Sequence, residues 1–109
     1  MAVRFSVVVP SYNEGAYIAD TINSLRAQGF RGAWEIVVVD NNCTDDTADI
    51  ARGLGARVVA EPRQGVCNAR QRGAEASRGE IIVSADADTI YPTDWLDNID
   101  ASFRADHRV

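Results

Sequence analysis

Short apolar runs alternate along the chain with segments in which apolar residues recur at helical spacing. The runs 5–10 (FSVVVP) and 34–40 (WEIVVVD) are rich in β-branched residues, which is typical of buried strands. Between them, segment 14–28 places four apolar residues at helical spacing: Tyr17, Ile18, Ile22 and Leu25. The pattern therefore predicts a strand, a helix and a second strand.

The same alternation continues in the second half of the chain. A helix is predicted over residues 44–53, because Thr44 is suited to cap its N-terminus and two aspartates follow in its first turn. A weaker strand is predicted over 57–60. Gly65 then opens a helix over about 66–77, whose small residues would let it lie close against a sheet: Ala69, Gly73, Ala74 and Ala76.

A fourth strand and a final helix complete the pattern. The strand covers residues 80–85 (EIIVSA), and the helix follows Thr93 as its N-cap. Trp95, Ile99 and Phe103 then fall on one helical face, which we expect to lie in the core. The predicted order is β-α-β-α-β-α-β-α, without a repeat or a linker.

The fold class follows from this order. Continuous apolar strands separated by helices are typical of a parallel sheet covered on both faces, and right-handed crossovers leave few topologies. We therefore predict a single α/β domain over residues 1–109, with a parallel, doubly wound, Rossmann-like sheet. In such a sheet the carboxyl ends of the strands share one edge, and ligands bind there.

The loops after the four predicted strands are polar and acidic. Taken one at a time, Asn13, Asp40 and Asp45 are also ordinary turn and capping residues, and Arg70 and Arg72 would lie on a solvated helix face. The concentration of such residues at one sheet edge nevertheless exceeds what turns need. The side chains expected there are Ser11, Tyr12, Asn13, Glu14, Asn41, Asn42, Cys43, Glu61, Arg63, Gln64, Asp86 and Asp88.

Composition and charge exclude several function classes. All 11 basic residues among the 109 are Arg, so mechanisms that need a lysine, such as Schiff-base chemistry, are excluded. The net charge of −5 argues against nucleic acid as a partner. No apolar run approaches the roughly 20 residues of a membrane span, and Arg4 interrupts the N-terminus before a signal-peptide stretch could develop. We expect a cytoplasmic protein in which Cys43 and Cys67 are free thiols.

Asp86 and Asp88 stand two residues apart, directly after the fourth predicted strand. Such carboxylates repel each other unless a cation or strong hydrogen-bond donors lie between them. Oxygen ligands favour Mg²⁺ or Mn²⁺ over zinc, and Mg²⁺ is commonly held by one or two carboxylates together with substrate phosphates. The pair therefore predicts a divalent metal that bridges to a diphosphate, with an acidic turn as the structural alternative.

Four motifs occur in order along the chain. They are 10–14 (PSYNE), 39–45 (VDNNCTD), 65–73 (GVCNARQRG) and 79–88 (GEIIVSADAD). Together with Pro92 and the Trp95-Leu96 pair that follow, they resemble the family 2 glycosyltransferases, which share the GT-A fold. The resemblance implies a nucleotide-sugar donor, with a UDP-sugar favoured, and inversion at the anomeric carbon.

The resemblance also implies roles for individual residues. Those expected to bind the donor are Pro10, Tyr12, Glu14, Asp40, Arg70 and Asp86. The first three would line the nucleoside pocket, Asp40 would accept a hydrogen bond from the base, and Arg70 would lie near the base or the diphosphate. Asp86 would face the ribose, and Asp88, with Asp86, would hold the metal.

The chain departs from the family pattern in sequence and in length. Many members have Asn where this chain has Gln64 and Gln71, and often an Asp where it has Thr89. The chain corresponds to roughly the first half of the family's catalytic domain, so no catalytic base can be assigned. We expect these 109 residues to bind a nucleotide or nucleotide sugar and to turn over poorly or not at all. A truncated sheet would favour self-association through an exposed edge or apolar patch.

Two other functions are compatible with parts of the pattern. Residues 81–89 (IIVSADADT) also fit a haloacid dehalogenase phosphatase, with Asp86 as nucleophile and Asp88 as acid/base. That chemistry needs a lysine and a further acidic cluster, whereas only 20 residues follow Thr89 and none is Lys. A noncatalytic nucleotide-binding module would bind the same ligand without transferring the sugar.

Overall fold

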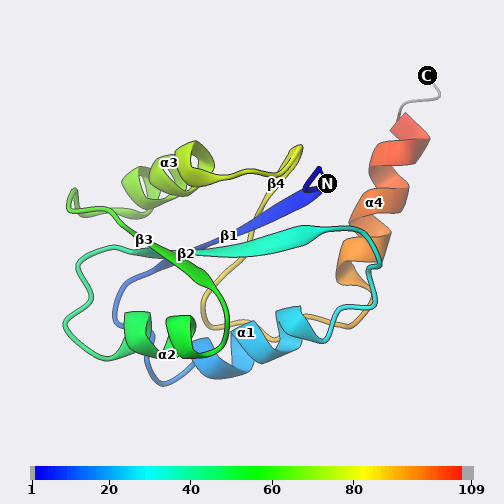
Figure 1. Cartoon of the computed structure of the whole chain (residues 1–109). Helices are drawn as coiled ribbons and strands as arrows, with labels where there is room; N and C mark the ends of the chain where they lie inside the picture. The colour runs from blue at the N-terminus through cyan, green and yellow to red at the C-terminus, as the bar shows by residue number, and fades with distance from the viewer. Residues whose placement is uncertain (1, 107–109) are drawn as a thin grey trace.

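In the computed structural model, which describes residues 2–106, strands and helices alternate in the predicted order (Figure 1). The apolar, β-branched runs form the strands, and the segments with helical periodicity form the helices. The strands are β1 (Phe5–Ser11), β2 (Trp34–Asp40), β3 (Arg57–Ala60) and β4 (Ile81–Ser84). The helices are α1 (Ile18–Arg26), α2 (Thr47–Gly53), α3 (Val66–Ala76) and α4 (Trp95–Asp106).

The four strands form one parallel sheet in the order β3-β2-β1-β4. Helices α1 and α2 lie on one face and α3 on the other (Figure 1), which confirms the predicted doubly wound α/β fold. Strand β1 lies between β2 and β4, so the chain reverses its direction of travel across the sheet beside β1. Ligands of open α/β sheets bind outside the carboxyl ends of the strands at such a reversal.

The two central strands, β1 and β2, are buried on both faces, as their continuous apolar runs require. Phe5, Val7 and Val9 of β1 pack into the larger core on the side of α1, α2 and α4. Val8 of β1 and Ala69 of α3 belong to the smaller core on the opposite face. Successive side chains of a strand point to opposite faces of the sheet, so a single apolar run contributes residues to both cores.

Helix α3 approaches the sheet closely through small residues. Ala69 and Gly73 are buried, and a Cβ atom on Gly73 would lie 2.2 Å from Cγ1 of Val8. Ala74, which was expected to share this face, is exposed. The close packing of the helix therefore depends on one side of it, where Gly73 meets β1.

Three expectations about the ends of helices were wrong. Helix α2 begins at Thr47, three residues after Thr44, because the Asp45 carboxylate accepts hydrogen bonds from Thr47 and holds residues 44–46 in a turn. Tyr17 precedes α1 and is 57% exposed. Phe103, expected in the core, is 41% exposed, because the last turns of α4 extend past the sheet (Figure 1).

A polar network joins the strands at the end of the sheet opposite their carboxyl ends. The half-buried Glu35 carboxylate accepts hydrogen bonds from Ser6 Oγ (2.5 Å), from the Arg78 backbone N–H (2.7 Å) and from Arg57, with which it also forms an ion pair. Burial raises the pKa of Glu35, but these hydrogen bonds and the Arg57 charge outweigh it and lower the pKa overall. Glu35 therefore stabilises the fold as a carboxylate.

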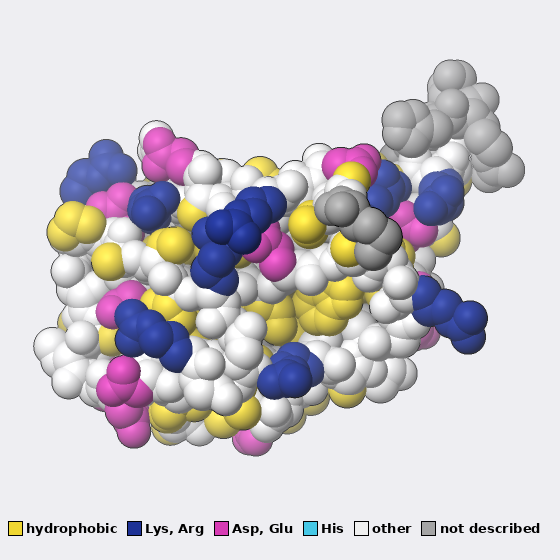
Figure 2. Space-filling model, viewed as in Figure 1, with side chains coloured by type: hydrophobic (Ala, Val, Ile, Leu, Met, Phe, Trp, Pro, Cys, Tyr) yellow, Lys and Arg dark blue, Asp and Glu magenta, His cyan; other side chains and the backbone are white. Residues whose placement is uncertain are grey.

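The surface shown in Figure 2 carries arginines interspersed with acidic side chains rather than one continuous basic patch. Within residues 2–106, no helix combines the length and apolar character needed to cross a membrane. Cys43 and Cys67 are free thiols, as expected.

Candidate functional site

A cavity of about 300 Å³ lies at the carboxyl ends of β1 and β2, beside the first turn of α3. Its lining comes from the end of one strand, three loops and one helix: Pro10, Ser11, Tyr12, Glu14, Asn41, Gln64, Val66 and Ala69. The side chains of Tyr12 and Val66 are exposed there, at 53% and 52%. A ring and an aliphatic side chain beside amide and carboxylate groups suit a ligand with flat apolar faces and polar edges.

The loop between β1 and α1 is tied to the loop between β2 and α2. Asn13 has a positive φ of 53°, and its side-chain oxygen accepts the backbone N–H of Thr44 at 2.8 Å. The backbone N–H groups of Glu14 and Gly15 donate to Thr47 Oγ1 and Asp45 Oδ2, both at 3.0 Å. The cavity wall that includes Tyr12 and Glu14 is therefore held in place by the neighbouring loop.

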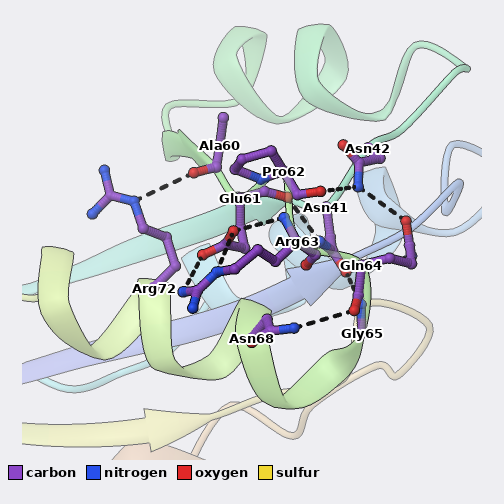
Figure 3. A network of polar contacts seen from close by, with 10 residues as sticks. All are labelled: Asn41, Asn42, Ala60, Glu61, Pro62, Arg63, Gln64, Gly65, Asn68 and Arg72. Carbon is purple, nitrogen blue, oxygen red and sulfur yellow. Dashed lines mark hydrogen bonds and ion pairs between the residues drawn. The ribbon is translucent and has the colours of Figure 1, made fainter.

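The loop between β3 and α3 is held by the buried side chain of Asn41 (Figure 3). Its amide nitrogen donates to the carbonyl oxygens of Glu61 and Arg63, both at 2.8 Å, and its oxygen accepts the Gly65 N–H at 3.0 Å. Gly65 has a φ of 127°, a conformation that favours glycine, and it begins the turn into α3. Asn41 thus sets the position of the cavity wall that contains Gln64.

Neighbouring side chains strengthen this loop (Figure 3). The amide of Asn42 donates to the Pro62 carbonyl at 2.9 Å and to Gln64 Oε1 at 3.0 Å. The carboxylate of Glu61 accepts hydrogen bonds from Arg63, both from the backbone N–H and from the guanidinium, and these contacts lower the pKa of Glu61. These contacts join the loop both to Asn42 and within itself.

Three of the predicted donor-binding residues line the cavity, namely Pro10, Tyr12 and Glu14. Asp40 ends β2 without lining it, and its Oδ1 accepts the backbone N–H of Cys43 at 2.9 Å, the turn contact expected of such a residue. Arg70 is exposed on α3 outside the lining.

The segment after β4 carries the two predicted metal ligands. Buried and exposed residues alternate over 85–88: Ala85 and Ala87 are buried, and Asp86 and Asp88 are exposed. Burial, the charge of Asp88 and that of Asp45 together raise the pKa of Glu14. Strand β4 pairs in parallel with β1, whose carboxyl end lines the cavity, so the segment with Asp86 and Asp88 leaves the sheet at the same edge as the cavity.

The donor set fits a divalent cation only in part. Among residues 2–106, no group of three or more His, Cys, Asp or Glu side chains is placed to hold a metal by itself. Asp86 and Asp88 nevertheless provide two exposed carboxylates, and Mg²⁺ is commonly held by one or two carboxylates plus substrate phosphates. The residues present thus fit a metal that arrives with, or is completed by, a diphosphate.

Sequence reasoning did not single out the residues that organise this site. Asn41 was grouped with the polar loop residues, and Thr21, Ser24 and Gln28, which contact the segment after β4, were not noticed. The one available signal was that these polar residues lie on or just after a helix, next to apolar residues. Their hydrogen-bond partners are backbone atoms far away in the sequence, and no local pattern identifies those partners.

Comparison with known proteins places the chain in a family. The model of the family described as "Glycosyl transferase family 2" matches residues 6–109. The chain belongs to glycosyltransferase family 2. The resemblance in the four motifs is thereby confirmed, and the phosphatase interpretation of Asp86 and Asp88 loses its support.

Family 2 relatives share both sequence and fold with the chain. Glycosyltransferase AglE of Haloferax volcanii is 32% identical over 99 residues, which are 84% of this chain and 33% of AglE. The crystal structure of S. aureus TarS 1-349 in complex with UDP is 30% identical with a TM-score of 0.85, over 96% of this chain and 33% of that one.

A mannosyltransferase, PcManGT from Pyrobaculum calidifontis in complex with GDP-Man and Mn²⁺, is also similar. It is 32% identical with a TM-score of 0.81, over 90% of this chain and 31% of PcManGT. The chain therefore spans about a third of the length of these family 2 relatives.

Proposed function

We propose that the chain provides the donor and metal site of an inverting glycosyltransferase that transfers a sugar from a nucleoside diphosphate, with a UDP-sugar favoured, to an acceptor hydroxyl. The observation that carries this proposal is the cavity at the carboxyl ends of β1 and β2, with Asp86 and Asp88 following β4, which pairs in parallel with β1. Complexes of family members with UDP, and with GDP-Man and Mn²⁺, support it.

In this proposal the cavity binds the nucleoside. Tyr12 provides an exposed ring for contact with the base, and Pro10 and Val66 provide apolar surface. Asp40 accepts a hydrogen bond from a ring N–H, which uracil and guanine offer and cytosine lacks. Arg70 lies toward the diphosphate and Asp86 toward the ribose.

The reaction is a displacement at the anomeric carbon. The bond from the acceptor oxygen to that carbon forms on the face opposite the diphosphate, the bond to the diphosphate oxygen breaks, and the hydroxyl proton passes to a general base. A divalent cation held by Asp86 and Asp88 would offset the charge that develops on the departing diphosphate. The chain's own residues hold the nucleoside and the carboxylates in place, and the proposal assigns the base to none of them.

The decisive experiment is titration calorimetry with UDP in EDTA and in Mn²⁺. The wild type should bind UDP more tightly with Mn²⁺, because the chain has no lysine to neutralise a diphosphate. Asp88→Asn should lose this Mn²⁺-dependent increase and retain the affinity measured in EDTA. Equal wild-type affinity under both conditions would refute the metal assignment and leave Asp86 and Asp88 as an acidic turn.

Base recognition by Asp40 can be separated from its turn contact. Asp40→Asn keeps an acceptor for the Cys43 N–H but loses the carboxylate charge. If Asp40 binds the base, this variant should weaken UDP binding by roughly 10- to 150-fold, the equivalent of a charge-assisted bond of about 1.5–3 kcal/mol. Binding of inorganic diphosphate should be unchanged. If the variant binds UDP as tightly as the wild type, Asp40 does not bind the base, and its role is limited to the turn contact with Cys43.

A noncatalytic nucleotide-binding module remains the second candidate. It predicts the same binding of UDP and the same response to Mn²⁺ as the transferase. Transfer of the sugar by a protein that continues beyond these 109 residues, tested with a panel of acceptors, distinguishes the two.

A further inference from the structure

Helix α1 contacts the segment that carries Asp86 and Asp88 through hydrogen bonds to its backbone. Thr21 Oγ1 donates to the carbonyl oxygen of Ala87, the residue between the two aspartates, at 3.0 Å. Ser24 Oγ accepts the backbone N–H of Tyr91 at 3.0 Å. The segment after β4 runs alongside α1 (Figure 1), so these contacts join elements that are far apart in the sequence.

The contact continues beyond the end of α1. Gln28 donates to the Pro92 carbonyl at 2.6 Å and accepts the Leu96 N–H at 2.9 Å. Tyr91 in turn accepts the backbone N–H of Asp86 on its hydroxyl at 2.7 Å, and its ring packs against Trp95 with centroids 4.2 Å apart. The backbone around the two aspartates is therefore held from both sides.

Burial makes the Thr21 contact important for geometry. Thr21 is 1% exposed and Ala87 is 5% exposed, so water cannot easily replace the hydroxyl as a donor to this carbonyl. Ala87 and Asp88 lie in a turn, in which the Thr89 N–H donates to the Asp86 carbonyl at 3.4 Å. The position at which the buried Ala87 is held therefore affects how the flanking Asp86 and Asp88 project into solvent. Packing alone does not need the hydroxyl, since a valine has nearly the same shape.

We propose that Thr21 and Tyr91 are positioning residues that hold Asp86 and Asp88 in the orientation needed to bind a metal shared with the donor diphosphate. The inference rests on the proposed function, because it assigns those carboxylates to the metal. Thr21 acts through the carbonyl of Ala87, and Tyr91 acts through the amide of Asp86. Neither residue contacts the nucleoside cavity, whose lining lies elsewhere.

The test uses Thr21→Val, which removes the hydroxyl, and Thr21→Ser, which keeps it. Tyr91→Phe removes the second contact. The matched control is Ser77→Ala, since Ser77 Oγ also donates to a backbone carbonyl, that of Gly73, at the far end of α3. For each variant, UDP affinity is measured in EDTA and in Mn²⁺, and exchange of the Asp86 amide hydrogen is measured by NMR without ligand.

Thr21→Val and Tyr91→Phe should reduce the Mn²⁺-dependent increase in UDP affinity by about 3- to 10-fold, the range expected for one hydrogen bond. UDP affinity in EDTA should change by less than about 2-fold, because the cavity is formed by other residues. The Asp86 amide should exchange faster in both variants. Thr21→Ser should restore the wild-type values, and Ser77→Ala should match the wild type in every measurement.

The positioning role is overturned if Thr21→Val keeps the full Mn²⁺-dependent increase, or if it weakens UDP binding equally in EDTA and in Mn²⁺. The second result would mean that the hydroxyl only supports the fold. Failure of the wild type to bind UDP, or to respond to Mn²⁺, would instead refute the proposed function. In that case the Asp86 amide exchange still decides whether Thr21 and Tyr91 hold the segment.

Discussion

Asn41→Asp changes one terminal group of the side chain that holds the loop between β3 and α3. The amide nitrogen that donates to the carbonyls of Glu61 and Arg63 becomes an oxygen, while the acceptor for the Gly65 N–H is kept. Asn41 is 2% exposed, so water cannot easily take over the lost role. The carbonyl of the buried Glu61 and that of the exposed Arg63 then lose this donor and face a carboxylate.

The expected cost is large for a domain of this size. An unsatisfied buried acceptor costs about 1–3 kcal/mol, and the Glu61 carbonyl becomes one. The total free energy of unfolding of a natural domain is only about 5–15 kcal/mol. We therefore expect Asn41→Asp to reduce the free energy of unfolding by about 1–3 kcal/mol. It should also weaken UDP binding, because Gln64 of the cavity lining lies in this loop and Val66 directly follows it.

Urea denaturation followed by the fluorescence of Trp34 and Trp95, both half-buried, measures the change. The midpoint should fall by roughly 1 M, given the usual dependence of about 1–3 kcal/mol per M. Asn42→Asp is the matched control, since Asn42 also donates twice to this loop and the change in charge is the same, but its side chain is exposed. A midpoint for Asn41→Asp within error of that for Asn42→Asp would refute the reasoning.

Two further predictions concern the sheet. Because the pKa of Glu35 is lowered in the folded state, its contribution to stability is full above pH 4.5, its ordinary value, and is lost as the pH falls below it. Glu35→Gln should therefore flatten the decline of the urea midpoint on acidification, and an unchanged decline would exclude Glu35 as its source. Gly73→Ala should lower stability by up to about 2 kcal/mol, since overpacking against Val8 costs about 1–3 kcal/mol and the gain in helix propensity offsets about 1. In a double-mutant cycle with Val8→Ala the two losses should be less than additive, and strict additivity would show that the two residues do not meet.

The parts of the fold that depend on local pattern were predictable from the sequence. The runs around Val7 and Val37 identify strands buried on both faces, and this alone leads to a doubly wound sheet. The start of α2 was not predictable, because Asp45 could either lie within a helix or accept hydrogen bonds in the preceding turn. In the structure Asp45 lies in the turn, where its carboxylate also accepts a hydrogen bond from the Gly15 N–H of the neighbouring loop.

The candidate site shows the same division. The polar loops and the pair Asp86 and Asp88 were visible because they follow strands in the sequence. The residues that hold those loops were not, since Asn13, Asn41 and Thr21 each bond to backbone atoms of a distant segment. An asparagine in a turn is common whether or not it has such partners, so only the three-dimensional structure shows what it holds.

The position of β1 between β2 and β4 has a consequence for the order in which the protein is assembled. Pairing of β1 with β2 and of β2 with β3 needs only the first 60 residues, and every residue that lines the cavity precedes β4. The pairing of Phe5 with Ile81 and the contact of Thr21 with Ala87 close much longer loops, whose chain entropy delays them. During synthesis from the N-terminus, strands β1 to β3 and every residue of the cavity lining are therefore made before the segment that carries Asp86 and Asp88, and the contacts of that segment with β1 and α1 are the last to become available.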